Sequence, residues 1–304
     1  MIGGNSMESK VNILVATYNG EKYLSELFDS LLSQTYPNIT IYVLDDGSSD
    51  HTMDIINEYK NKGIKLIPNA HNLGYPFSFY KLLTNCGDAD YYCLCDQDDV
   101  WYPDKVETSI QILEKSDNSK PQLCFSAFEY CDEKLNHLRN SDDPPHNITF
   151  LKTFFQCYMW GFTTVFNHAF RTKFISHLPE KTRDEDYWFH MMAAVFGELH
   201  YNPKISAKHR RHGENHSQDP TSFIRFQLWR IKYFLFHNQF RIYHGMLQEF
   251  YEYYKNELPE KERKQLKLFQ ADGHSLQKAF YPERLRNKIF DEIMLRIAFL
   301  LHKL

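Results

Sequence analysis

The chain has 304 residues, of which 42% are hydrophobic and 24% charged, and its formal net charge is −4. This length predicts one large domain or two ordinary ones, and the balanced composition excludes a chain that is disordered as a whole. We see no signal segment and no run of the ~20 apolar residues that a membrane span needs. Six cysteines without paired CxxC motifs indicate buried, reduced thiols. We therefore expect a cytoplasmic protein.

The first hundred residues alternate between strand and helix patterns. The β-branched run at 11–17 predicts a first strand, and apolar residues at helical spacing from Leu24 to Leu32 predict a helix. Further strands are expected within 39–50, 64–69 and 90–96, separated by helices at 51–63 and 77–87. Such alternation predicts an α/β fold whose mainly parallel sheet is flanked by helices.

The second half of the chain is less regular. We expect strands within 121–132 and 158–167 and a helix at 184–197, and the chain from 221 onward has a helical pattern. We predict a domain at 9–220 followed by a C-terminal helical region at 221–304. That region holds 15 Lys and Arg against 9 Asp and Glu, a net +6 on a chain that is acidic elsewhere. The asymmetry suggests an anionic partner surface.

Polar residues stand where the four predicted strands end. They are Thr17, Tyr18 and Asn19; Asp45 and Asp46; Asn69 and Asn72; and Asp96, Asp98 and Asp99. Ligands of parallel sheets bind beyond the carboxyl ends of the strands, so we expect these residues to converge. No GxGxxG or P-loop motif is present, which excludes the usual dinucleotide fingerprint.

The carboxylates of the DQDD segment suit a hard cation. Asp96 and Asp98 provide oxygen ligands of the kind that Mg²⁺ or Mn²⁺ prefers, and phosphate oxygens usually complete such a shell. The segment therefore predicts a diphosphate substrate bound through a metal ion. The alternative is a solvated acidic turn.

Several ordered motifs resemble one family. The stretches ILVATYNGEKYLSELFDSLLSQTYPN, VLDDGSSDHT, NLGY and CDQDDVWYPDKV resemble the nucleotide-binding half of family 2 glycosyltransferases, which have the GT-A fold. DEDYWF and HRRHGENHS resemble the acceptor-side signatures of that family, and DQDDVW with RxHGxN is most similar to bacterial rhamnosyltransferase-like members. The resemblance covers residues 11–220 and implies a GT-A fold with a C-terminal helical extension.

The resemblance also implies the residues of the donor site. Asp46 would accept a hydrogen bond from the imide N–H of uracil or thymine, with a turn-forming role as the alternative. Tyr18 would stack on the base or else pack in the core. The remaining nucleotide-side residues are Thr17, Asn19, Asn72 and Asp96, with Arg211 on the diphosphate. Metal ligands would be Asp96, Asp98 and His212. For Arg211 and His212, the alternative is a basic loop exposed to solvent.

Asp186 matches the family's catalytic base, which takes the proton of the acceptor hydroxyl. The family usually has His before this aspartate, whereas this chain has Glu185, so Asp184 and Glu185 compete for the role. An ordinary acidic helix start explains all three carboxylates without catalysis.

The resemblance implies an inverting, metal-dependent glycosyltransferase that uses Mn²⁺ or Mg²⁺. It would move a sugar, with rhamnose on dTDP expected first and UDP-sugars open, to a hydroxyl of a cell-surface polysaccharide precursor. The rival hypotheses are a non-catalytic sugar-nucleotide or glycan-binding protein and a nucleotidyltransferase.

The C-terminal region suggests a further partner. Its aromatic residues Trp229, Phe234, Phe236, Phe240 and Tyr243 stand among Arg225, Arg230, Lys232 and Arg241, and the last predicted helix has an apolar stripe with basic flanks. Such a helix can lie on an anionic bilayer. We therefore expect a glycan or lipid-linked glycan acceptor, peripheral contact with the inner face of the membrane, and no nucleic acid. A helical subdomain or a homodimer interface is the alternative.

Overall fold

The structure is a computed structural model that describes residues 8–182, 184–212 and 239–302. The chain forms two compact units that interleave in sequence. Unit 1 takes its residues from Met1–Asp143, Met159–Leu178 and Gly197–His212, and unit 2 from Pro144–Tyr158, Pro179–Phe196 and Gly213–Leu304. The domain boundary predicted at residue 220 lies outside the described residues.

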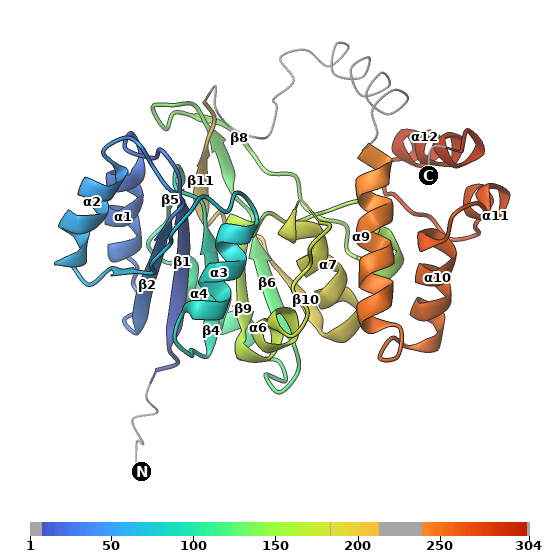
Figure 1. The fold of residues 1–304 in the computed structure, drawn as a ribbon, viewed down its shortest axis with the longest axis horizontal. Helices are drawn as coiled ribbons and strands as arrows, with labels where there is room; N and C mark the ends of the chain where they lie inside the picture. Colours follow the sequence, from blue (N-terminus) through green and yellow to red (C-terminus); the bar gives the residue numbers. More distant parts are fainter. Residues whose placement is uncertain (1–7, 183, 213–238, 303–304) are drawn as a thin grey trace. The chain divides into compact units, whose positions relative to one another are not determined.

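Unit 1 is built on a seven-stranded sheet in the order β10-β6-β9-β4-β1-β2-β3 (Figure 1). Its strands are β1 Val11–Thr17, β2 Ile39–Asp45, β3 Lys65–Leu66, β4 Tyr91–Cys95, β6 Gln122–Ser126, β9 Thr164–Asn167 and β10 Glu198–Asn202. The pairs β1–β2, β1–β4, β2–β3 and β6–β10 are parallel, whereas β9 runs antiparallel to β4 and β6. The prediction of a mainly parallel sheet is confirmed.

Helices flank this sheet, as predicted. They are α1 Leu24–Leu32, α2 Thr52–Lys60, α3 Phe77–Asn85, α4 Lys105–Leu113 and α6 His168–Ile175. One buried cluster joins alternate residues of β1, among them Val11 and Ile13, to α1, α2 and α4. Leu14 is equally buried but points to the other face, because successive strand residues alternate. Cys93 and Cys95 both belong to the first cluster, and all six cysteines are free.

A second sheet, in the order β5-β11-β7-β8, was not predicted. Its strands are β5 Val100–Trp101, β7 Glu129–Cys131, β8 His137–Asn140 and β11 Ala207–Arg210. β5 pairs antiparallel with β11, so that Lys208 lies opposite Val100. Because β5 directly follows the DQDD segment, this pairing brings residues 209–212 beside those carboxylates.

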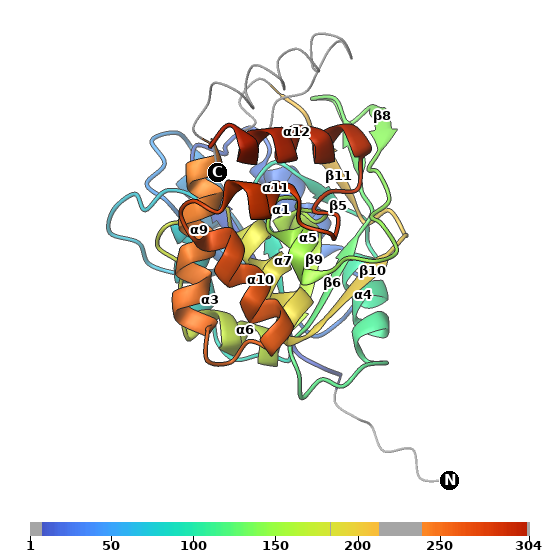
Figure 2. The same cartoon turned by 90° about the vertical axis from the view of Figure 1, so that its right-hand side faces the viewer.

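Unit 2 is helical in the part that the structure describes. Its helices are α5 Phe150–Thr153, α7 Glu185–Phe196, α9 Gln239–Tyr254, α10 Glu260–Gln270, α11 Ser275–Ala279 and α12 Ile289–Leu300. Pro259 immediately precedes α10, at the predicted break, and α11 and α12 lie side by side (Figure 2). Trp229, Phe234, Phe236, Arg225, Arg230 and Lys232 lie outside the described residues. Among the described helices, none combines the length and the apolarity that crossing a membrane requires.

Candidate active site

The loops after β1 and β2 are tied to each other through polar side chains. Asp45 caps its own turn: its carboxylate accepts from the backbone N–H groups of Gly47 and Ser48 at 3.2 and 3.0 Å. Thr17 is buried and donates to Asp45 Oδ1 at 3.0 Å. The hydroxyl of Thr17 thus serves the strand end itself, and its predicted contact with the nucleotide stays a prediction.

Asp46 organises the loop that follows β3. Its carboxylate accepts from the backbone N–H groups of Leu73 and Gly74, both at 2.7 Å, and from Asn69 Nδ2 at 2.9 Å. Asn72 Nδ2 donates to the carbonyl of Asp46 at 2.7 Å. Since a carboxylate has about four lone-pair positions, these contacts leave capacity for a further donor such as a base imide.

Tyr18 and Asn19 form the most exposed part of this loop cluster. Tyr18 is 51% exposed, so core packing, the alternative to its stacking role, does not account for the ring. Asn19 adopts φ +49°, a left-handed conformation that asparagine tolerates better than most residues. Its side chain accepts from the backbone N–H of Ser49 at 2.9 Å. The convergence predicted for these strand ends is therefore seen in direct contacts.

The DQDD turn concentrates negative charge at low exposure. Burial raises the pKa of Asp96 to about 8, and the neighbouring carboxylates of Asp99 and Asp98 add to the shift. Asp99 is fully buried, and burial also raises the pKa of its carboxyl group. Within the described part of the chain, Asp99 Oδ2 has no hydrogen-bond partner. Such a turn favours a cation nearby.

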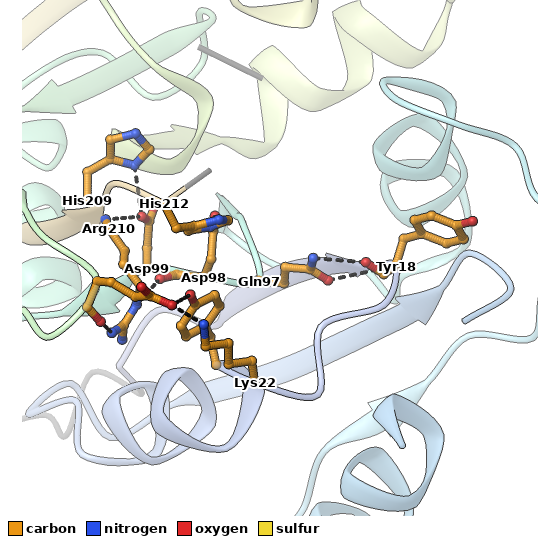
Figure 3. Close-up of polar contacts among 10 residues, drawn as sticks. Tyr18, Lys22, Gln97, Asp98, Asp99, His209, Arg210 and His212 are labelled. Atoms are coloured by element: carbon orange, nitrogen blue, oxygen red, sulfur yellow. Dashed lines mark hydrogen bonds and ion pairs between the residues drawn. The ribbon is translucent and has the colours of Figure 1, made fainter. Parts of the chain in front are cut away.

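His209 holds the buried side of this turn (Figure 3). Its Nδ1 lies 2.9 Å from Asp99 Oδ1, and its ring stacks on Phe162 with centroids 4.9 Å apart and planes at 11°. Burial alone would lower the pKa of His209, but the carboxylate of Asp99 more than offsets this and raises it. The contact fixes β11 against the DQDD turn.

His212 meets Asp98 in the same turn (Figure 3). Its Nε2 lies 2.8 Å from Asp98 Oδ2, and its ring lies against Tyr23 with centroids 5.0 Å apart. These two predicted site residues are 114 positions apart in the chain. Both are only partly exposed, so the structure brings together a carboxylate and an imidazole beside the converging strand ends.

Arg210 is a site residue that sequence reasoning missed. Its guanidinium is buried and donates to the carbonyls of Asp98 and Glu133 at 3.0 and 2.6 Å, and to Glu26 at 2.5 Å. The predicted phosphate ligand, Arg211, instead has its guanidinium carbon 5.9 Å from the Tyr130 ring centre. Two adjacent arginines cannot be told apart by motif; in the structure β11 ends at Arg210, and it is this arginine that bonds the backbone of the DQDD turn.

Lys105 is a buried cation beneath the carboxylates. Its Nζ donates to the carbonyl of Phe162 and lies 3.6 Å from the centre of the Trp101 ring. Burial lowers its pKa to about 8, against the opposing influence of nearby groups that include Asp99 and Asp96. This lysine adds a positive group beside the three aspartates of the turn.

The residues present fit a divalent cation in their chemistry. Carboxylate oxygens and an imidazole nitrogen are suitable ligands, and the partnerless Asp99 oxygen marks the turn as rich in acceptors. Within residues 8–182, 184–212 and 239–302, however, no three His, Cys, Asp or Glu side chains are gathered as a ready metal site. Asp98 and His212 meet, and the predicted participation of Asp96 stays a prediction.

The three carboxylates at the start of α7 differ in their surroundings. Asp184 Oδ1 accepts the backbone N–H of Asp186 at 3.0 Å and so caps the helix. Glu185 is 2% exposed, whereas Asp186 is partly exposed. Trp188, which follows, is fully buried and packs on Phe250 with centroids 5.0 Å apart. The helix start thus has one capping carboxylate, one buried carboxylate and a third, Asp186, that is partly exposed as a residue although its Oδ1 is buried, all in unit 2.

Known proteins resemble this chain in sequence. The sequence model described as Glycosyl transferase family 2 matches residues 12–178. An uncharacterized glycosyltransferase of Rickettsia conorii is 30% identical over 242 residues, which cover 70% of this chain and 36% of that protein. The dTDP-rhamnosyl transferase RfbG of Shigella flexneri is 35% identical over 105 residues, covering 33% of this chain and 36% of the relative. The chain thus spans little more than a third of the length of these relatives.

Solved structures resemble it in fold. S. aureus TarS 1-349 in complex with UDP has a TM-score of 0.59 at 18% identity, over 97% of this chain and 80% of that one. The mannosyltransferase PcManGT of Pyrobaculum calidifontis, in complex with GDP-Man and Mn²⁺, has a TM-score of 0.54 at 13% identity, over 97% and 75%. These likenesses confirm the predicted GT-A-like fold, a sheet flanked by helices with a C-terminal helical part.

Proposed function

The chain belongs to glycosyl transferase family 2, and on that premise we propose that it is an inverting glycosyltransferase acting on a nucleotide-sugar. It transfers a sugar from a dTDP- or UDP-sugar to a hydroxyl of a cell-surface polysaccharide precursor, free or lipid-linked. The supporting observation is the contact between Asp98 and His212, 2.8 Å apart. It joins two distant segments of this chain at the loops where the family resemblance expects the donor diphosphate.

The base of the donor is a pyrimidine in this proposal. Asp46 already accepts three bonds from the loop after β3 and so has capacity for about one further donor, which matches the single imide N–H of uracil or thymine. Guanine would present two donors, its N1–H and its amino group. Tyr18, half exposed beside it, provides a face for stacking. Rhamnose is the first sugar to test, because a dTDP-rhamnosyl transferase is among the proteins similar in sequence to part of this chain.

A divalent metal would be held by Asp98 and His212, with Asp96 beside them. When bound, it would supply Lewis-acid stabilisation of the leaving diphosphate. The chain's own contribution is to orient that diphosphate: Arg210 holds the Asp98 backbone, and His209 holds Asp99. Arg211 adds a guanidinium suited to bidentate phosphate contact.

Asp186 is the general base in this proposal. It takes the proton of the acceptor hydroxyl while the new C–O bond forms at the anomeric carbon and the bond from that carbon to the diphosphate oxygen breaks. A single displacement inverts the configuration at that carbon. Asp184 is the poorer candidate because its carboxylate is the helix cap, and Glu185 because it is buried.

The test is turnover on a panel of dTDP- and UDP-sugars, with release of the nucleoside diphosphate as the readout. We expect release that rises with a glycan acceptor and with Mn²⁺ or Mg²⁺, and Asp98→Ala should abolish the response to metal. Equal nucleotide affinity with and without EDTA would overturn the metal role. Binding without release on any donor would support the non-catalytic rival, and release of inorganic diphosphate from a nucleoside triphosphate would support the nucleotidyltransferase.

We also propose that α11 and α12 contact an anionic membrane surface. An apolar face on these helices is exposed, made of Leu276, Phe280, Ile289, Ile293, Ile297 and Leu300. We name it the α12 surface. The two acidic residues of α12, Asp291 and Glu292, are buried on its other side, while Lys288 at its start is exposed. An apolar stripe flanked by Lys288, on a helix whose two acidic residues are buried, suits anionic lipid headgroups.

Co-sedimentation with anionic vesicles tests this contact. We expect binding that weakens at high salt and that Ile293→Asp reduces, whereas Asn256→Asp, which adds the same charge between α9 and α10, leaves it unchanged. Equal binding of the two variants, or no binding by the parent chain, would overturn the proposal. A parent chain that ignores vesicles and forms a dimer that Ile293→Asp dissociates would identify a protein interface instead.

A further inference from the structure

Gln97, the middle residue of the DQD motif, is bonded to the backbone of the loop after β1. Its Oε1 accepts the backbone N–H of Tyr18 at 2.8 Å, and its Nε2 donates to the carbonyl of Tyr18 at 3.0 Å. Figure 3 shows both bonds side by side. The side-chain amide therefore pairs with both polar groups of one residue, as a neighbouring strand would.

This pairing continues the sheet beyond its last backbone bonds. β1 and β4 are parallel neighbours whose register ends at Val15 opposite Cys95. Gln97 extends the connection to Tyr18, past the end of both strands. On its other side the loop is fixed by Asn19, whose backbone N–H donates to Ser48 Oγ at 2.8 Å.

Gly20 is fitted to Gln97. A Cβ at position 20 would lie 2.5 Å from Gln97 Oε1 and 2.9 Å from its Cδ, and the third-nearest atom also belongs to Gln97. These separations are too short for real atoms, so any side chain at 20 must displace the amide. The backbone of Gly20 does not itself need glycine, because it lies outside the left-handed region.

We propose that Gln97 is a positioning residue that holds the base-side loop and the carboxylate turn at a fixed spacing. One end of the turn meets Tyr18 through Gln97, and the next residue, Asp98, meets His212. The ribose linkage limits the distance between the base and the phosphates of a nucleoside diphosphate. A fixed spacing between the two loops therefore favours both contacts at once. The inference rests on the proposed function, since it assumes that a nucleoside diphosphate binds here.

The geometry also explains why the amide is needed. The N–H and carbonyl of Tyr18 require one acceptor and one donor, and glutamine provides both. Glutamate would turn an oxygen toward the carbonyl of Tyr18 and would add a fourth carboxyl group to the turn. Methionine would match the length of Gln97 and make neither bond.

The experiment is a double-mutant cycle on Gly20 and Gln97, read by calorimetric titration of UDP and dTDP with Mn²⁺. We expect Gln97→Ala and Gly20→Ala each to lower the affinity for the nucleotide that the parent binds more tightly by about 10-fold. This is the scale of one or two lost hydrogen bonds. In the Gln97→Ala background the collision is gone, so Gly20→Ala should cost less than about twofold. If the loss of affinity in the double variant equals the product of the two single losses, the two residues act independently and the inference is overturned.

Two controls separate positioning from general stability. Gln97→Met should lower the affinity for UDP as much as Gln97→Ala does. Both variants should raise the KM for the donor while kcat changes less. Inorganic diphosphate, which needs only the carboxylate turn, should inhibit the parent and the Gln97 variants equally. If diphosphate and UDP lose affinity in parallel, the effect is on the turn alone and the inference is wrong.

The outcome also separates this inference from the proposed function. If the parent chain binds neither UDP nor dTDP, both are overturned. If the parent binds and the Gln97 variants bind equally well, only the positioning role is overturned, and the nucleotide site stands.

Discussion

Units 1 and 2 surround their candidate site residues differently. In unit 1 the loops that carry the candidate donor site are bound by polar side chains, such as Asp46 to two backbone N–H groups and Gln97 to Tyr18. In the described part of unit 2 the candidate base stands on an aromatic core, in which Phe155, for example, packs on Phe299 with centroids 5.7 Å apart.

This difference decides what a substitution can report. A polar residue of unit 1 supports the loop and stands ready for a ligand, so its removal changes both stability and binding. In unit 2, Asp186 stands in the first turn of α7 and is partly exposed as a residue, although its Oδ1 is buried. A change there should affect the chemistry with little cost to the fold.

Asp186→Asn should give the largest effect. The change keeps the shape and the backbone N–H that Asp184 accepts, but it removes the proton acceptor. We expect turnover to fall by roughly 10² or more, the usual scale for a general base, with nearly unchanged donor binding and thermal midpoint. Steady-state kinetics and calorimetry measure the two.

Asp184→Asn and Glu185→Gln are the matched controls for this substitution. Asp184→Asn should weaken the helix cap and lower stability more than turnover. If Asp186→Asn remains active while either control loses activity, the base is a different carboxylate. The contrast between the units then no longer rests on Asp186.

Asp46→Ala should show the opposite behaviour in unit 1. It removes the acceptor of the Leu73, Gly74 and Asn69 bonds and leaves buried donors without a partner. We expect a loss of about 2–3 kcal/mol in the free energy of unfolding, together with weaker nucleotide binding. Urea denaturation measures the first, and Asp46→Asn, which keeps one acceptor oxygen, should lose less. Unchanged stability would mean that the loop does not depend on this carboxylate.

The sequence predicted the fold of unit 1 well where hydrophobic patterning was continuous. The strand at 11–17 and the buried run at 91–95 were found because apolar and β-branched residues fill them, and their parallel order placed the polar strand ends together. The second sheet was missed because β5 has only two residues and β8 is exposed along its whole length. Neither leaves a periodic signal.

The site was predictable by residue type more than by role. The pairing of Asp98 with His212 follows from two motifs that the family resemblance joins, since nothing local connects residues 114 positions apart. Arg210 and Gln97 were missed because most of their partners are backbone carbonyls and N–H groups. A sequence does not display backbone partners, which depend on how distant strands end beside one another.

His190 provides a test of the aromatic unit by pH. It is fully buried on α7, edge-on to Tyr158 with centroids 5.4 Å apart, and burial lowers its pKa from 6.5 to about 3. As pH falls below 6.5 the unfolded chain takes up a proton that the folded chain does not. The free energy of unfolding should therefore fall, with about 2 kcal/mol lost from this group between pH 7 and 5.

Denaturation of the parent and His190→Leu at pH 7 and 5 measures that contribution. Leucine has a similar volume and no proton to bind, so the variant should lose about 2 kcal/mol less over the same range. Identical pH slopes would show that His190 is not a buried neutral group in solution, and that unit 2 is less closely packed than its rings indicate.

The smallest expected effect lies at Asn19, where a polar side chain and the backbone conformation can be separated. Its φ of +49° is left-handed, and its side chain accepts from Ser49 N–H. Asn19→Gly loses the hydrogen bond but suits the conformation, whereas Asn19→Ala loses the bond and adds strain. We expect alanine to be less stable than glycine by about 1 kcal/mol, measured as the shift in urea midpoint at constant slope. If alanine equals glycine, the loop relaxes out of the left-handed region when the Ser49 bond is lost. Its conformation would then depend on polar contacts alone, which is the stronger form of the contrast with unit 2.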